Sequence, residues 1–514
     1  MTRYTSKSVK FLGVTVALTA LLGTGCAPKI ESTGSSAQNV FSVAMEALDD
    51  RYLQPIKPDA VMMAGLSRMS RIDGRLTVWR TPGSVVLAID GDAIVERPAP
   101  APDNLYGWAE MGAQIVGDAR VVSSQIATTS QDGIFNPIFE GLVEGLDRYS
   151  RYLPPDDAVN SRASREGFGG IGIQIDKVDT EIVIRKVYAN RPATLAGLMK
   201  NDRITHVDGH PMRGLSLGDV VKRLRGRVGD TVTVTIQRSD IVNPFARDII
   251  RDYIVASTVD VKIHGNILEV RLSGFNTGTV GTLRRAIVKS AREIGKVDGV
   301  VFDLRGNPGG LLDQAISVSD LFLTRGRIIS TKGRHPESNQ TFDASPGEVL
   351  PGVPIVVVVN GRSASAAEIV AVALRDSGRA AIVGSSSFGK GTVQTIIRLP
   401  NHGELNITWA RLYAPSGQTL DRQGLVPAIC TNRPAKALET LISSLKQTSG
   451  KPTIDLAGLR LQAQLPHFSS ARRVACTPTD AEGDQDIVAA RLLLQNKALY
   501  ASSVAQIAPN VAER

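Results

Sequence analysis

The 514-residue chain is 42% hydrophobic, 21% charged and 5% aromatic, a composition that excludes a disordered or membrane-spanning protein. At about 150 residues per domain, the length predicts roughly three folded units. The net charge of +9 is spread as scattered Lys and Arg among acidic residues, without a basic run or interleaved aromatic residues, so nucleic acid is not an expected partner.

The N-terminus has the pattern of an export signal. Three basic residues precede the apolar stretch 11–22, which is too short to span a bilayer. The run LLGTGCAP resembles a lipobox with its Leu one position too far upstream, which predicts cleavage after residue 25 and lipidation of Cys26. The alternative is a plain signal peptide with an incidental Cys. We expect an exported protein, lipid-anchored at the periplasmic face of a bacterial membrane, with residues 26–39 as a flexible tether.

Four regions follow the tether. Residues 40–166 mix helical patterns with a strand-like insert at 75–97, which is open to interpretation as a partner or dimer surface. Residues 167–257 are short β-branched runs punctuated by Gly, which predict a compact, mostly β module. In residues 258–434 apolar strands alternate with helices, as in an α/β sheet, and residues 435–514 are partly helical without expected chemistry. The predicted fold is therefore a mixed multidomain one.

Ser365 is the first candidate for chemistry. It lies in NGRSASAAEIVAVAL, between an apolar strand and a helix of three- and four-residue apolar spacing. The backbone N-H groups from Ala366 onward are suited to stabilising an oxyanion. Because Ser is also a preferred helix cap, Ser365 by itself does not establish a nucleophile.

Lys390 is the candidate base. It lies between two glycines in SSSFGKGTVQTI, and Lys acts as a base only where burial or a nearby cation lowers its pKa. Ser-Lys pairs are a variant of the Ser-His-Asp arrangement. GKGT lacks the first half of a P-loop, so a nucleotide-binding interpretation is weak, and Lys390 alone would be read as a surface lysine.

The third stretch is VVFDLRGNPGGLLDQA, a strand that breaks into glycines before a helix. A turn of this kind lets backbone N-H groups approach a ligand, and Gly310 is the candidate second oxyanion donor. An ordinary loop between a strand and a helix has the same composition.

Together these stretches resemble the carboxyl-terminal processing, or tail-specific, proteases, a family of Ser-Lys peptidases with a PDZ domain. The resemblance runs from about Pro137 to Ile429, through LVEGLDRYSRYL, FGGIGI, DLRGNPGG, the stretch from SASAAEIV to FGKGTVQ, and LYAPSGQTLDRQGLVP. The 25-residue step from Ser365 to Lys390 matches the family's spacing. Ala367 and Asn201 depart from residues usual in the family, without removing a group that the mechanism needs.

The resemblance implies a role for each residue. Ser365 is the nucleophile, Lys390 its base and Gln394 the residue that orients the lysine, while the N-H groups of Ala366 and Gly310 form the oxyanion hole. Residues 167–257 become the PDZ domain, which serves substrate recognition or gating, with a carboxylate-binding loop of Gly170, Ile171, Gly172 and Ile173 that favours apolar C-termini. A turn that binds nothing is the alternative for this loop.

If Cys26 is lipidated, Cys430 and Cys476 remain, either as a disulfide or as two buried thiols. The six His residues lie far apart, so neither a metal nor an organic cofactor is expected.

The predicted activity is that of an exported serine endopeptidase that cleaves polypeptides near C-termini or in unstructured tails. Its expected partners are protein or peptide substrates with accessible C-termini, and an activating or adaptor protein is left open. The alternatives are a non-catalytic PDZ adaptor on a protease-like scaffold and a hydrolase of small esters or cell-wall peptides.

Overall fold

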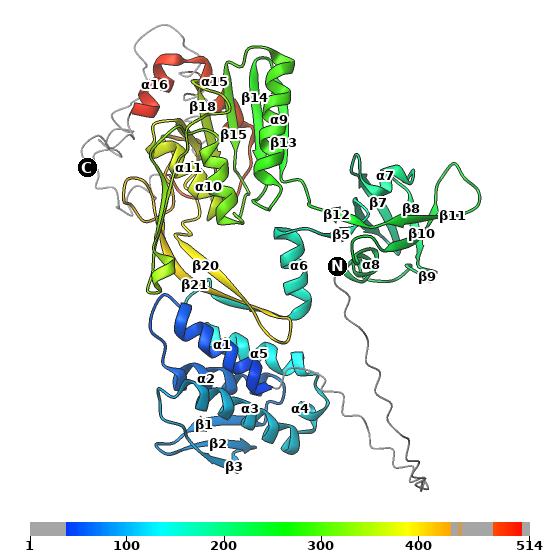
Figure 1. The fold of residues 1–514 in the computed structure, drawn as a ribbon, viewed down its shortest axis with the longest axis vertical. Coiled ribbons are helices and arrows are strands. Elements are labelled where there is room, and N and C mark those ends of the chain that lie inside the picture. Colours follow the sequence, from blue (N-terminus) through cyan, green and yellow to red (C-terminus); the bar gives the residue numbers. More distant parts are fainter. Residues whose placement is uncertain (1–36, 433–439, 441–442, 444–475, 506–514) are drawn as a thin grey trace, which may run out of the picture.

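The computed structural model describes residues 37–432, 440, 443 and 476–505, which form three bodies of mixed helix and sheet (Figure 1). The expected export signal, Cys26 and most of the expected tether lie outside the described residues. The last three tether residues, 37–39, already belong to the first helix.

The N-terminal body is helical and carries a three-stranded antiparallel sheet, β1-β2-β3. Its apolar helix faces converge on one core around Phe41, Trp108, Phe135 and Phe139. Its elements are α1 (Ala37–Arg51), α2 (Pro58–Ser67), η1 (Arg68–Arg71), β1 (Leu76–Arg80), β2 (Ser84–Ile89), β3 (Asp92–Pro98), α3 (Leu105–Val122), α4 (Ser124–Thr128) and α5 (Gln131–Glu144).

A β-rich body follows after β4 (Arg151–Leu153) and α6 (Pro155–Arg165). Its main sheet has the order β11-β10-β8-β7-β6, with β9 on β8, and β5 pairs with β12. This body lies to one side of the rest of the molecule (Figure 1). Its elements are β5 (Phe168–Gly170), β6 (Ile173–Val178), β7 (Glu181–Val187), α7 (Pro192–Leu195), β8 (Arg203–Val207), β9 (His210–Pro211), α8 (Leu217–Leu224), β10 (Thr231–Gln237), β11 (Phe245–Ile250) and β12 (Asp252–Ile254).

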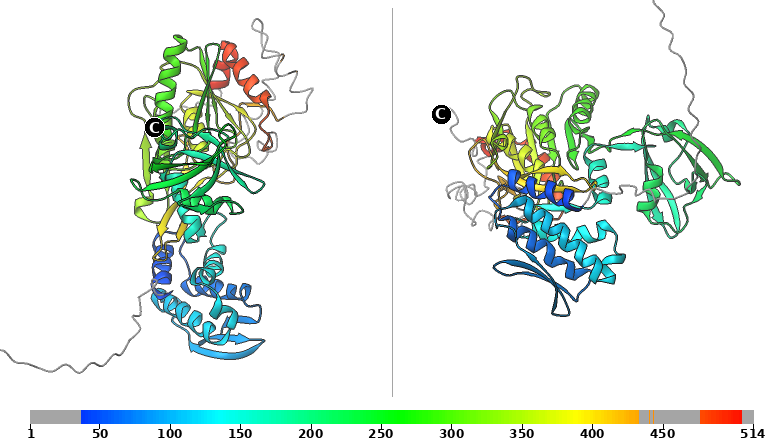
Figure 2. Two further views of the ribbon diagram at one scale, coloured as in Figure 1. Left: turned by 90° about the vertical axis from the view of Figure 1, so that its right-hand side faces the viewer. Right: turned by 60° about the horizontal axis from the view of Figure 1, so that its bottom comes forward.

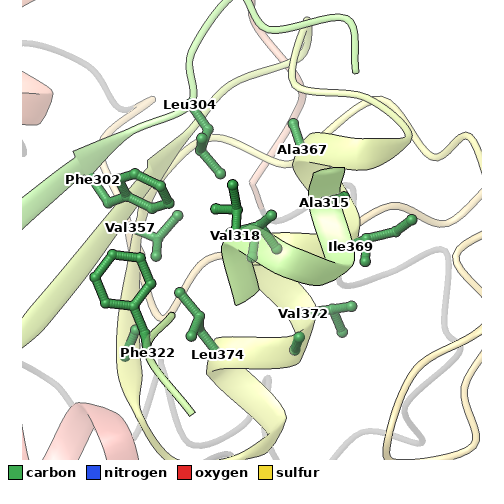
Figure 3. Close-up of a cluster of buried hydrophobic side chains, with 14 of the residues drawn as sticks. Phe302, Leu304, Ala315, Val318, Phe322, Val357, Ala367, Ile369, Val372 and Leu374 are labelled. Carbon is green, nitrogen blue, oxygen red and sulfur yellow. The ribbon is translucent and has the colours of Figure 1, made fainter. Parts of the chain in front are cut away.

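The third body is a three-layer α/β unit around the sheet β13-β14-β15-β18-β19-β22, parallel from β14 onward. Every residue of β15 and β18 is buried, because helices cover both faces. Helices α9 to α11 cover one face, where Phe302, Phe322 and Val357 interdigitate with them (Figure 3). Helices α15 and α16 cover the other face.

The elements of this body are β13 (Val259–His264), β14 (Ile267–Leu272), α9 (Thr279–Ile294), β15 (Gly299–Asp303), α10 (Leu312–Asp320), β16 (Arg327–Lys332), η2 (Pro336–Ser338), β17 (Gln340–Asp343), β18 (Ile355–Val359), α11 (Ala366–Asp376), β19 (Ala380–Gly384), β20 (Thr392–Arg398), β21 (Glu404–Tyr413), β22 (Ile429–Cys430), α15 (Asp484–Gln495) and α16 (Lys497–Ala505).

A second sheet, β17-β16-β21-β20, links the α/β unit to the helical body. The β20–β21 hairpin reaches toward the N-terminal helices (Figures 1 and 2), and its residues Leu399, Leu405 and Ile407 join their core. Strand β4 pairs with β21, so the segment just before it is held beside the hairpin. Three loops leave the carboxyl ends of β15, β18 and β19, where α/β sheets place their functional groups.

Candidate active site

Ser365 occupies a strained turn between β18 and α11. Its φ of 56° is in the left-handed region, which a residue with a side chain adopts at a cost. The helix begins immediately afterwards at Ala366, and Ile369 N donates to Ser365 O at 2.9 Å. A serine held in this way between a buried strand and a helix N-terminus has the geometry of a nucleophile elbow.

Lys390 lies on the loop that leaves β19, next to the turn of Ser365. Ser385 N donates to Val359 O at 3.1 Å, and Phe388 N donates to Ser363 O at 3.0 Å. These bonds fasten the loop of the lysine to the segment that leads into the Ser365 turn. The structure therefore brings together two residues that lie 25 positions apart in the sequence.

Glu368 connects the two turns. Its fully buried carboxyl accepts hydrogen bonds from Ser365 N at 2.8 Å, Gly389 N at 2.8 Å and Lys390 N at 2.9 Å. Ser387 Oγ donates a fourth bond to this carboxyl. The same hydroxyl oxygen accepts a bond from Leu425 N, so its own hydrogen is available for Glu368. Burial raises the pKa of Glu368, and the four donated bonds oppose that rise.

Glu368 was not predicted from the sequence. It lies in the apolar run AAEIVAVAL, where its charge is the one sign of a special role. The Glu368 carboxylate links the two turns through their backbone N-H groups. These bonds do not involve Ser365 Oγ or Lys390 Nζ.

The surroundings of Lys390 favour its neutral form. Burial, together with the smaller effect of the positive charge of Arg151, lowers the pKa of Lys390 to about 8. The charges of Glu368 and Asp147 act in the opposite direction but do not cancel the effect of burial. An amine with this pKa is partly deprotonated near neutral pH, as a general base must be.

The segment 147–151 of the N-terminal body forms one wall of the site. The Tyr149 ring lies with its centroid 5.3 Å from Lys390 Nζ. Its hydroxyl is buried, with no hydrogen-bond partner among the described residues. This wall was missed because its sequence, LDRYSRYL, gives no direct sign that it lies near Lys390.

Gln394 is held within a hydrogen-bonded chain that ends in the same wall. Its Nε2 donates to Thr392 Oγ1 at 3.0 Å and to Thr408 Oγ1 at 3.2 Å. Thr408 Oγ1 in turn donates to Asp147 Oδ1 at 3.0 Å. The amide orientation is thereby fixed, with its nitrogen committed to two hydroxyls.

The glycine loop 307–310 packs directly against the Ser365 turn. Ala364 N donates to Asn307 O at 2.9 Å, and a Cβ on Gly309 would lie 2.9 Å from Ser365 Cβ. Gly310 has a φ of 148°, and a Cβ there would lie 2.1 Å from Phe275 O. Phe275 N donates to Gly309 O, and Leu311 N donates to Phe275 O. Neither of these bonds uses the N-H of Gly310. Glycine is therefore required at both positions for this close approach.

The C-terminal segment 476–486 contacts the three loops that leave β15, β18 and β19. The sequence had predicted no chemistry for this part of the chain. A disulfide joins Cys476 to Cys430, one of the two alternatives left open by the sequence. Gly361 N donates to Thr479 O at 2.7 Å, and Thr479 N donates to Ser385 Oγ at 3.2 Å. Arg305 also bonds Asp486 at 3.0 Å, so the segment fastens all three loops.

The expected carboxylate-binding loop lies in the β-rich body. Gly170 pairs with Asp252, and Gly172 has a φ of 80° that favours glycine. Ile171 is only 2% exposed and belongs to the core of this body, whereas Ile173 begins the edge strand β6. Ile173 is thus the more accessible of the two side chains.

Other features lie away from these turns. A cavity of about 460 Å³ between β13–β15 and α15 is lined mainly by charged residues, among them Arg271, Asp303 and Arg491. Within the described residues no cluster of three or more His, Cys, Asp or Glu side chains could hold a metal ion. In the same part of the chain, the helices are too short or too polar to cross a membrane.

Known proteins resemble this chain in both the α/β and the β-rich bodies. Residues 266–431 match Peptidase family S41, and residues 169–245 match the PDZ domain. A carboxy-terminal-processing protease of Bartonella bacilliformis is 39% identical over 318 residues, 61% of this chain and 73% of that protein. A carboxy-terminal processing protease of Bacillus subtilis is 31% identical over 318 residues, 61% of this chain and 67% of that protein. Among solved structures, the photosystem II D1 C-terminal processing protease has a TM-score of 0.40 and 23% identity, over 77% of this chain and 93% of that one.

Proposed function

Because this chain belongs to the carboxy-terminal processing proteases of peptidase family S41, serine-type proteases that carry a PDZ domain, we propose that it cleaves polypeptides with a Ser365–Lys390 dyad. The observation that best supports this dyad is the Glu368 carboxylate, which bonds the backbones of both residues. A scaffold without catalysis would not need to bury a charged group to hold these two turns together.

In this mechanism the neutral Lys390 amine takes the proton of Ser365 Oγ as the oxygen bonds to the scissile carbonyl carbon. The N-H groups of Ala366 and Gly310 stabilise the oxyanion of the tetrahedral intermediate. When the C-N bond breaks, the Lys390 ammonium returns the proton to the leaving amine. Lys390 then activates a water molecule, which hydrolyses the ester on Ser365.

Gln394 and the wall of the site prepare the base for this role. The Thr408–Asp147 pair fixes the Gln394 amide, which we propose restricts the lysine to orientations that reach Ser365. The ring of Tyr149 covers the amine, and this cover contributes to the burial that lowers the pKa of Lys390.

We propose that the PDZ domain recognises the substrate or gates its access to the active site. We propose that the loop 170–173 receives a chain terminus while the substrate pairs with the edge strand β6. Proteins with accessible C-termini or unstructured tails are therefore the expected substrates. An activating or adaptor protein is compatible with this scheme.

Export and lipid anchoring through Cys26 remain proposals that rest on the N-terminal sequence pattern. In that location the enzyme would act on exported proteins at the periplasmic face of a bacterial membrane. The Cys430–Cys476 disulfide is compatible with an oxidising compartment.

The test is cleavage of an unstructured protein with an apolar C-terminus, followed by mass spectrometry of the products. We expect turnover by the wild type and none by Ser365→Ala or Lys390→Ala, with all three proteins folded. Substantial turnover by either folded variant would contradict the dyad. Tail binding without turnover by the wild type would favour the adaptor alternative.

A further inference from the structure

Strand β13 is the long open edge of the main sheet of the α/β unit. Within the described residues β13 pairs only with β14, and it ends the strand order of this sheet. The opposite edge, β22, is two residues long, whereas β13 has six. Figure 1 shows β13 on the side of the unit that lies away from α16. An edge of this length offers a row of backbone N-H and C=O groups to another strand.

The side chains of β13 alternate between the two faces of the sheet. Val259 and Val261 are half-buried and pack against the core that α9 covers, and Ile263 continues their row at 45% exposure. Asp260 and Lys262 are exposed on the other face. In the described part of the chain neither of these two charged side chains has an ion-pair or hydrogen-bond partner.

The order of side chains along β13, apolar-acid-apolar-base-apolar, is complementary to itself when the strand is reversed. If a second β13 pairs antiparallel with Val261 opposite Val261, each Asp260 lies opposite Lys262 of the other copy. In the same register each Val259 lies opposite Ile263 of the other copy.

Other registers lose this match. A shift by two residues places Asp260 opposite Asp260, or Lys262 opposite Lys262, and like charges directly opposite each other are destabilising. A shift by one residue sets the charged side chains against the apolar row of the other face. Charges on an edge strand usually prevent pairing, but on β13 they select one register.

The neighbouring strands extend the complementarity. On β14, Arg271 lies opposite Asp260 and Glu269 lies opposite Lys262. On β15, Asp303 follows Arg271, with the two side chains in an ion pair at 3.2 Å. Across the joined sheets the charges alternate in the order Asp303, Arg271, Asp260, and then Lys262 and Glu269 of the second copy. Two-fold symmetry repeats this row on the other side of the Val261 pair.

We infer that β13 is a homodimer interface, through which a second copy of this chain pairs antiparallel about Val261 and the two six-stranded sheets become continuous. One short strand pair buries little surface, so the dimer should be weak and in exchange with the monomer. The inference does not depend on the proposed protease function, because β13 contributes no residue to the candidate active site.

The first experiment tests the register by cross-linking the full chain through a single introduced cysteine. The background is Cys26→Ser, since the other two cysteines form a disulfide. Val261→Cys should give a disulfide-linked dimer on mild oxidation, because the two copies of residue 261 lie directly opposite each other. Ile263→Cys is the matched control. Although Ile263 is well exposed, its two copies would lie about 14 Å apart, too far for a disulfide.

The second experiment reverses the charges and measures the dimer Kd of the full chain by sedimentation. Asp260→Lys and Lys262→Asp should each weaken the dimer by about 10- to 100-fold, because like charges then meet at two symmetric positions. An equal mixture of the two variants should form a heterodimer of nearly wild-type affinity, since two lysines on one strand face two aspartates on the other. Asp92→Lys, which changes an exposed acid on the edge strand β3, should leave the Kd unchanged.

Three results would each overturn the inference. The first is a wild type that stays monomeric from about 1 to 100 µM, where a weak but specific dimer would form. The second is a dimer whose Kd is unchanged by both charge reversals, or not restored in the mixture of folded variants. The third is cross-linking through Ile263→Cys as readily as through Val261→Cys, which alters no charge and so remains decisive if a charge variant fails to fold.

Discussion

The pKa of Lys390 determines how the activity should depend on pH. With a pKa of about 8, about a quarter of the Lys390 side chains are neutral at pH 7.5. With the ordinary value of 10.5, roughly one in a thousand would be neutral at that pH. Burial thus increases the fraction of base-competent enzyme by a factor of roughly 200.

The assay is kcat/KM for a peptide substrate without ionisable groups, measured from pH 6 to pH 10. We expect a tenfold rise per pH unit at low pH, a midpoint near 8 and a plateau above it. Arg151→Gln removes a charge that disfavours the ammonium, so the pKa of Lys390 and the midpoint should rise. A midpoint above 10 in the wild type, or an unchanged midpoint in Arg151→Gln, would refute the reasoning.

Further predictions concern stability. Lys390→Met should be inactive but more stable than the wild type at pH 7, by up to about 3 kcal/mol in urea unfolding, because the pKa of Lys390 is lower in the folded state than in the unfolded state. This gain in stability should fade as the pH rises from 8 through 10.5. A variant less stable than the wild type at pH 7 would argue against a buried ammonium that destabilises the folded state. Glu368→Gln should lose about 2 to 4 kcal/mol and most of the activity, since the amide NH2 group replaces one of two oxygens, each of which accepts from two of the four donors; unchanged unfolding would exclude the proposed link. Replacing both Cys430 and Cys476 by Ser opens a 46-residue separation and should cost about 2 to 4 kcal/mol with a lower kcat, whereas full activity would show that the loops need no support from the segment 476–486.

The α/β unit could be predicted from local patterns. The apolar runs that became β14, β15 and β18 alternate with the amphipathic runs that became α9, α10 and α11. Such runs reflect burial on both sheet faces and on one helix face, which depend on residues near in sequence. The confirmed family assignment rests on motifs in the same unit and in the PDZ domain.

The closest supports of the site depend on contacts between residues distant in sequence. Glu368 looks like one charge in an apolar helix until its donors from the lysine loop are seen. Tyr149 and Arg151 approach Lys390 because β4 pairs with β21, more than 250 residues away in the chain. The segment 476–486 carries no motif, because it acts mainly through backbone groups that any sequence offers.

The central claim is that Lys390 activates Ser365 as a nucleophile. The most direct measurement is labelling with a fluorophosphonate at pH 8, followed by peptide mapping of the wild type and of Lys390→Met. The account predicts a single adduct on Ser365 in the wild type and little or none in the folded Lys390→Met variant. An adduct on another residue, or equal labelling of Ser365 without Lys390, would contradict it.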